Sequence, residues 1–221
     1  MYLSKLTLDP RHLGARRDLA DAYEMHRTLA RAFAPDESSA PARFLWRLEP
    51  PRSGDVPSDV LVQSGMAGRW SVVEALDGYT RALQPNKLVD LDAFVRAGME
   101  YRFRLVANAT VTRDGKRLGL LSEEEQLAWL SRQGGRHGFV VLDVIRLAST
   151  RLGARSGRDR PALTFQSARF EGLLTIEDPG KVASALTGGI GHGKAFGLGM
   201  LSLAPIWNSP MHVRKQEESP P

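Results

Sequence analysis

The first residues of the chain alternate between apolar and polar side chains, as a half-buried β-strand does. Residues Tyr2–Leu8 follow this alternation, so we predict a strand there. A helix is predicted next, because Asp21 is a good N-cap and Glu24 lies three residues later, in the position of a capping box. The predicted elements of the first half are strands at 2–8, 44–49, 60–64 and 87–91, with helices at 22–33 and 72–82.

The same order of elements returns in the second half of the chain. Ser122 caps a strong helix pattern, and Pro179 stands at the first position of another helix, where proline is tolerated. The predicted elements are strands at 100–107, 139–147, 163–176 and 198–203, with helices at 123–132 and 178–186.

Each half therefore has the order β-α-β-β-α-β, which is the ferredoxin-like arrangement used by many RNA-binding sheets. We predict an α+β fold of two tandem ferredoxin-like (RRM-like) domains, at residues 1–92 and 98–205. Residues 206–221 contain few apolar anchors and are expected to be a disordered tail.

Composition and charge favour nucleic acid as a partner. The chain has 221 residues, a formal charge of +5, a pI near 9.8, and 24 arginines against 6 lysines. The guanidinium fork suits phosphate groups, although a net charge of +5 is modest. The chain contains no cysteine, which excludes disulfides, thiol catalysis and cysteine-based zinc sites. No signal-like start or bilayer-length apolar run is present, so we expect a cytoplasmic protein without a membrane partner.

A glycine-rich segment at residues 188–205 reads GGIGHGKAFGLGMLSLAP. Glycines allow positive φ, and successive free N–H groups can form a concave anion site beside the charge of Lys194. The spacing of a P-loop is present from Gly188 to Lys194, but Ala195 replaces the magnesium-binding hydroxyl. A dinucleotide fingerprint fails as well, because Lys194 and Phe196 occupy the two positions where its last glycine could stand. The segment is either a site for a phosphate-bearing partner or a mobile surface turn.

His26 is the strongest candidate for an acid or base. It follows Tyr23 by three residues on the predicted helix, so the two rings share a face, and it lies between the apolar stripe and the arginines Arg27 and Arg31. A histidine in such a place can serve as a base at the rim of a cationic groove, or it can be inert. The other histidines are weaker candidates: His12 in the basic turn RHLGARR, His137 in a loop, His192 in the glycine-rich segment and His212 in the tail. No pair has the i, i+4 spacing of a helical metal site, so no metal is expected.

A second basic element lies between the two long predicted strands, at residues 151–160. Because glycine and serine interrupt it, we expect a flexible loop that either clamps a duplex backbone or is simply solvated. Phe165 and Phe170 are candidates for stacking on RNA bases, but both fit a core equally well. The loop's cations are Arg151, Arg155, Arg158 and Arg160.

Five segments occur in an order that resembles a known family. They are MYLSKL at 1–6, YEMHR at 23–27, FLWRLEP at 44–50, FRLVAN at 103–108 and GIGHGKAFGLGMLSLAP at 189–205. The family is CasE, the CRISPR-associated endoribonuclease of the type I-E Cascade complex, and the resemblance runs from residue 1 to about 205. The sequence departs from it at Ala109, where the family typically has a proline.

The resemblance implies a tandem ferredoxin-like fold and an activity. That activity is cleavage of the repeat hairpin in precursor CRISPR RNA without metal or cofactor, after which the enzyme stays bound to the crRNA beside other Cascade subunits. By motif, Tyr23 and His26 are the catalytic pair. The resemblance implies RNA contacts at Arg27, Arg31, Arg151, Arg155, Arg158, Arg160, Gly191, His192, Gly193 and Lys194, the arginines less firmly than the glycine-rich segment.

Two alternatives remain open at this point. The first is a non-catalytic subunit of a ribonucleoprotein that binds structured RNA, although a pure binder does not need both Tyr23 and His26. The second is a protein-interaction module whose basic loops are incidental, which would bind structured RNA weakly and without sequence preference.

Overall fold

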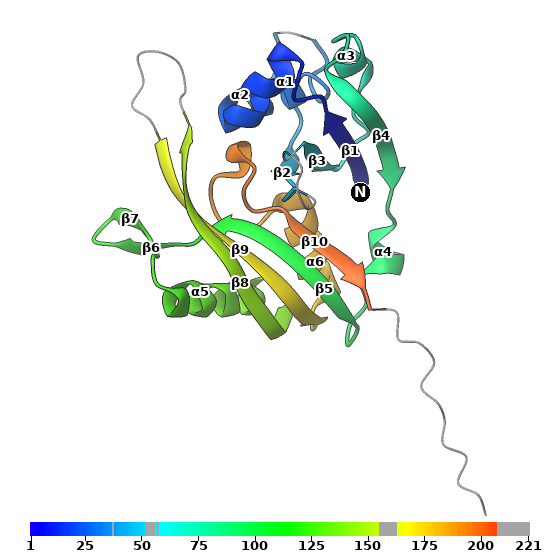
Figure 1. Cartoon of the computed structure of the whole chain (residues 1–221). Helices are drawn as coiled ribbons and strands as arrows, with labels where there is room; N and C mark the ends of the chain where they lie inside the picture. The colour runs from blue at the N-terminus through cyan, green and yellow to red at the C-terminus, as the bar shows by residue number, and fades with distance from the viewer. Residues whose placement is uncertain (37, 52–55, 57, 155–162, 207–221) are drawn as a thin grey trace, which may run out of the picture.

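Two antiparallel sheets of four strands make up the centre of the molecule (Figure 1). The structure is a computed structural model that describes residues 1–36, 38–51, 56, 58–154 and 163–206. In both sheets the strands lie in the order fourth, first, third, second along their half of the chain. That order is the ferredoxin-like one and confirms the predicted α+β class with two such domains. The limits of the domains at residues 92 and 98 stay a prediction.

The first sheet has the order β2-β3-β1-β4, and its long helices follow β1. Met25 and Leu29 of α2 pack into the core of this half together with Leu6 and Val62 of the sheet. The elements are β1 (Tyr2–Leu8), α1 (Leu13–Ala20), α2 (Ala22–Ala30), β2 (Phe44–Leu48), β3 (Asp59–Ser64), α3 (Ser71–Glu74), β4 (Thr80–Leu88) and α4 (Leu91–Phe94).

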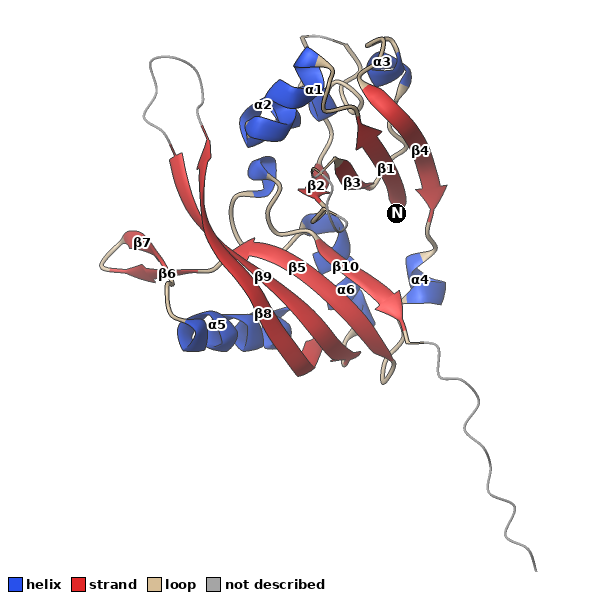
Figure 2. Ribbon diagram, in the orientation of Figure 1, coloured by secondary structure: helices blue, strands red, loops and turns tan. Residues whose placement is uncertain are grey.

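The second sheet has the order β10-β5-β9-β8 and is covered by α5 and α6 (Figure 2). Leu105 and Phe170 of the sheet are fully buried against Trp129 of α5 and Val182 of α6. The elements are β5 (Glu100–Asn108), β6 (Thr110–Arg113), β7 (Lys116–Gly119), α5 (Glu123–His137), β8 (Phe139–Ala154), β9 (Leu163–Ile176), α6 (Pro179–Gly188), the short 3₁₀ helix η1 (Lys194–Phe196) and β10 (Leu201–Pro205).

Several elements differ from the prediction. The basic turn RHLGARR is part of helix α1, and the Nδ1 atom of His12 caps it by accepting from the N–H of Ala15 at 3.2 Å. His137 ends helix α5 instead of lying in a loop. The helix predicted at 72–82 stops at Glu74, because the buried Tyr79 anchors the chain through its hydroxyl to Asp18 and β4 then pairs with β1.

The two halves are joined by a buried guanidinium. Arg47 of β2 is 3 % exposed, and its Nη1 donates to the carbonyl oxygen of Met200 at 3.1 Å and to that of Arg104 at 3.4 Å. Its charge is met by Glu49 at 2.6 Å, which also pairs with Arg104, while Arg104 pairs with Glu171 on β9 at 2.8 Å. We call this interdomain group, Arg47, Glu49, Arg104 and Glu171, the arginine clasp.

A test of the clasp is the substitution Arg47→Ala. It removes the donor of two backbone carbonyl groups, while Glu49 keeps Arg104 as a partner, so the free energy of unfolding should fall by about 1–3 kcal/mol for each carbonyl group left unpaired. Arg81→Ala, which removes an exposed partner of Asp9, is the control and should cost about 1 kcal/mol or less. Urea denaturation measures both. Equal losses in the two variants would show that the clasp does not join the halves.

Candidate functional site

Helix α2 presents the predicted catalytic residues, and its rotation is fixed by three contacts. Asp21 caps the helix by accepting from the N–H of Tyr23 at 2.9 Å. Met25 and Leu29 are buried, and the hydroxyl of Thr28 donates to the buried Asp18 at 2.6 Å. The second half of the predicted capping box is absent.

The Glu24 carboxylate, which the capping box would have used, pairs instead with Arg27 at 3.0 Å and with Arg17 at 3.6 Å. Both arginines are more than half exposed, so these ion pairs contribute little to stability. Because these pairs are weak, the phosphate of a ligand can compete with Glu24 for Arg27.

His26 lies on top of a stack of three rings. Its imidazole is stacked on Phe44, with centroids 4.9 Å apart and an interplanar angle of 15°, and Phe44 is stacked on Phe33 at 4.7 Å and 17°. Nδ1 of His26 is fully buried and has no hydrogen-bond partner, whereas Nε2 is not a fully buried atom without a partner. Nε2 is thus the ring nitrogen that a ligand can reach.

The surroundings of His26 favour its neutral form. Burial lowers the pKa of His26 below its ordinary value of 6.5. The imidazole is therefore uncharged at neutral pH, the form in which it can accept a proton. Tyr23 is half-buried one helical turn earlier on the same face.

The glycine-rich segment lies next to this helix. Its short helix η1 packs against both α2 and β2, so the structure brings Lys194 and His26 into one region although they are far apart in sequence. In Figure 1 this segment, coloured orange, lies between α2 and the second sheet.

The turns of the loop depend on glycines with positive φ. Gly193 and Gly197 flank η1 with φ of 87° and 76°, and a Cβ at Gly197 would lie 3.0 Å from the ring of Trp46. The N–H groups of residues 196–199 are bonded to carbonyl oxygens of the chain.

Lys194 also folds back on its own loop. Its Nζ donates to the carbonyl oxygen of Gly191 at 2.7 Å. Burial lowers the pKa of Lys194, and the charge of Arg43, at the start of β2, lowers it further. The ammonium group of Lys194 and the guanidinium group of Arg43 therefore lie near each other where the loop meets β2.

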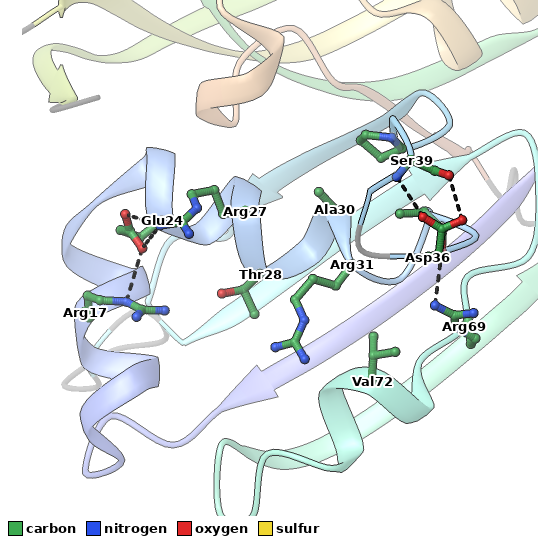
Figure 3. Close-up of a pocket in the computed structure, with 12 residues that line it drawn as sticks. Arg17, Glu24, Arg27, Thr28, Ala30, Arg31, Asp36, Ser39, Arg69 and Val72 are labelled. Atoms are coloured by element: carbon green, nitrogen blue, oxygen red, sulfur yellow. Dashed lines mark hydrogen bonds and ion pairs between the residues drawn. The ribbon is translucent and has the colours of Figure 1, made fainter. Parts of the chain in front are cut away.

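The outer side of α2 borders a pocket with a volume of about 650 Å³ (Figure 3). The predicted Arg27 and Arg31 both line it, and Arg31 has no ion pair in the described part of the chain. Two arginines that the sequence did not single out, Arg17 and Arg69, join them there. The pocket is cationic overall, since four arginines face only Glu24 and Asp36.

The remaining predicted residues divide between the loop beside α2 and other parts of the chain. Arg151 belongs to strand β8 and not to a loop, because β8 continues to Ala154 in register with β9. Arg155, Arg158 and Arg160, with His212, lie outside the described residues. Phe170 is a core residue, whereas Phe165 contacts Phe196 of η1 at 4.7 Å. Gly191, Gly193 and the exposed His192 belong to the loop beside α2.

Phe44 and Arg43, like Arg17 and Arg69, are residues of this region that the sequence did not single out. Phe44 reads as one apolar residue of a strand, and its contact with His26 depends on how β2 packs under α2. Among the residues that the structure describes, no group of three His, Asp or Glu side chains could hold a metal ion. None of the described helices is both long and apolar enough to cross a bilayer.

The two sheets and the His–Tyr helix beside a glycine-rich loop define a tandem ferredoxin-like protein with a histidine at a cationic surface. A family model described as "CRISPR associated protein" matches residues 1–205, and the chain belongs to this family.

Known relatives and solved structures match this chain over almost its whole length. The CRISPR-associated endoribonuclease Cse3 of Thermus thermophilus is 40% identical over 93% of this chain and 100% of its own length. The CRISPR system Cascade subunit CasE of Escherichia coli K12 is 31% identical, with the same coverage. A structure of Cse3 bound to a 19-nucleotide RNA has a TM-score of 0.83, at 40% identity over 93% of this chain and 100% of that one.

The ring stack makes a prediction about His26. In Phe44→Leu the flat apolar surface below the imidazole is lost and water gains access, so the pKa of His26 should rise toward 6.5. NMR titration of labelled histidine measures this in the free protein. Phe139→Leu truncates a buried ring in the other core and is the control. A shift of the same size in both variants would contradict a specific role of the stack.

Proposed function

We propose that this protein cleaves the repeat hairpin of precursor CRISPR RNA, without a metal ion, through attack by the 2′-hydroxyl of the RNA. The observation that carries the proposal is the neutral, partly accessible His26 held beside a cationic loop. It occurs in a chain 40% identical, over its relative's full length, to an endoribonuclease whose structure with RNA has the same fold.

The chemistry needs few groups from the protein. Nε2 of His26 accepts the proton of the 2′-hydroxyl, and the resulting oxygen attacks the adjacent phosphorus. The bond from phosphorus to the 5′-oxygen breaks, and that oxygen takes up a proton from Tyr23 or from water. The products are a 2′,3′-cyclic phosphate and a 5′-hydroxyl. Because the nucleophile belongs to the RNA, holding it in line with the leaving oxygen supplies much of the acceleration.

Cations around α2 support the phosphate. Arg27 and Arg31 lie on the same helix as His26, and Lys194 lies on the loop that packs against it. Their charges stabilise the negative charge that builds on the phosphate oxygens during attack. Arg27 must leave Glu24 to do this, which costs little at an exposed position.

The same proposal includes what happens after cleavage. The protein stays bound to the hairpin end of the crRNA and joins the other Cascade subunits. One relative is named as a Cascade subunit, and a chain in a CRISPR RNA-guided surveillance complex matches with a TM-score of 0.67 at 27% identity, over 93% of this chain and 100% of that one.

The deciding experiment is cleavage of labelled repeat hairpins in excess EDTA. Cutting should continue in EDTA and stop when the nucleotide before the cut carries a 2′-deoxyribose, since its nucleophile is then missing. Tight binding of every hairpin without cutting would replace the proposal by a non-catalytic RNA-binding subunit. If the protein bound no hairpin, the proposed function would fail and only the assignment of the fold would remain.

His26 is tested by substitution and by pH. His26→Ala should lower the single-turnover cleavage rate by roughly 10²–10⁴-fold with hairpin affinity nearly unchanged. In the wild-type protein the rate should fall as the pH drops through the lowered pKa of His26, because the protonated ring cannot accept a proton. A rate that instead falls as the pH rises through this range would make His26 the acid that protonates the 5′-oxygen.

A further inference from the structure

A second pocket borders the glycine-rich loop at His192. Its volume is about 510 Å³, within the range of small-ligand pockets. It is enclosed by the end of β5, the β6–β7 ribbon, β9 and the loop at His192. Its lining residues are Asn108, Thr110, Arg117, Gly119, Leu121, Phe165, Gln166 and His192.

Asn108 is the residue of this pocket that most needs an explanation. It is only 6 % exposed, yet its side-chain amide has no hydrogen bond to any residue that the structure describes. Its amide atoms have no partner in the described part of the chain and are not fully buried, so they are accessible from the pocket that Asn108 lines. An amide with an open donor and an open acceptor matches the edge of a nucleobase, on which asparagine can make two hydrogen bonds.

The backbone holds Asn108 in a fixed place between two partners. It is paired with Ser167 of β9 on one side and with His192 of the glycine-rich loop on the other. Asn108 ends the segment FRLVAN, one of the five that carry the family resemblance, and the mechanism proposed above gives that segment no role.

An aromatic ring lies on the same face of the sheet. Phe165 is two residues from Ser167 along β9, so its side chain shares a face with Asn108. It is half-buried, it lines the pocket, and it contacts Phe196 of η1. The ring is therefore held in place from behind and offers a surface on which a base can stack.

Two basic side chains complete the pocket. His192 and Arg117 both line it, from the loop and from β7. They lie close enough that the charge of Arg117, after burial, contributes to lowering the pKa of His192. Among the lining residues none is acidic, which suits a ligand that carries a phosphate.

We infer that this pocket binds a single unpaired nucleotide of the RNA, with its base on Phe165 and the amide of Asn108, and its phosphate near Arg117 and His192. A duplex cannot supply such a ligand, because its bases are paired and stacked within the helix. The inference rests on the proposed function for its RNA. It adds a site at which the protein recognises one base outside the stem of the hairpin.

The experiment uses the repeat hairpin that the protein cuts, blocked at the cut by a 2′-deoxy nucleotide. 2-Aminopurine replaces each nucleotide outside the stem in turn, and its fluorescence is followed as protein is added. One position should lose fluorescence by stacking, and Phe165→Leu should restore it. Phe94→Leu, which truncates a ring packed on Tyr101 near α4, is the matched control and should change nothing.

Asn108→Ala tests the amide. Affinity for the hairpin should fall roughly 5- to 150-fold, as expected for the loss of a bidentate base contact. With this variant the affinity should no longer depend on which base occupies the responsive position. Thermal unfolding of each variant shows that the fold is retained.

Three results would overturn the inference. Binding without a fluorescence change at any position, or with a change that survives Phe165→Leu, would remove the nucleotide pocket while leaving the proposed nuclease intact. Unchanged affinity and base preference in Asn108→Ala would do the same. If the hairpin did not bind at all, the proposed function itself would fail.

Discussion

Burial of one arginine between the two sheets is the constraint on which the rest of the structure depends. A guanidinium at this depth is tolerated only if its donors are all used, and Arg47 uses them on Glu49 and on two backbone carbonyl groups of the other half. Those carbonyl groups belong to Arg104 and Met200, on β5 and at the end of the glycine-rich loop. The two halves can therefore meet in only one register, which also places the loop.

That register explains why His26 has its particular surroundings. β2 carries Phe44 on the side that meets α2 and Trp46 against Gly197 of the loop, while Arg47 reaches the second sheet. A single strand thus supports the imidazole, supports the loop and joins the domains. The cost is that Nδ1 of His26 is left without a hydrogen-bond partner, which is a small local penalty.

The sequence alone predicts the periodic parts of this arrangement and misses the parts that depend on tertiary contacts. The strand Tyr2–Leu8, the cap at Asp21 and the order of elements in each half follow from local patterns, and the family resemblance points to His26 and the glycine-rich segment. The helix predicted at 72–82 is largely wrong because Tyr79 and the pairing of β4 with β1 override local preference. Phe44 and Asn108 have no sequence signal of their own, because their roles arise only where β2 meets α2 and where β5 meets the loop.

The glycine-rich loop touches both sites at once. Its η1 turn packs on the helix of His26, and its neighbouring residues His192 and Phe196 contact the pocket residues Asn108 and Phe165. Lys194 and the backbone of the loop are bonded within the chain, and these bonds favour one separation between the two regions. On the function proposed for His26 and the pocket inferred at Asn108, a base bound in the pocket lies a fixed number of nucleotides from the phosphate that meets His26. Uniform ends on the product RNA would be the outward sign of that rigid spacing.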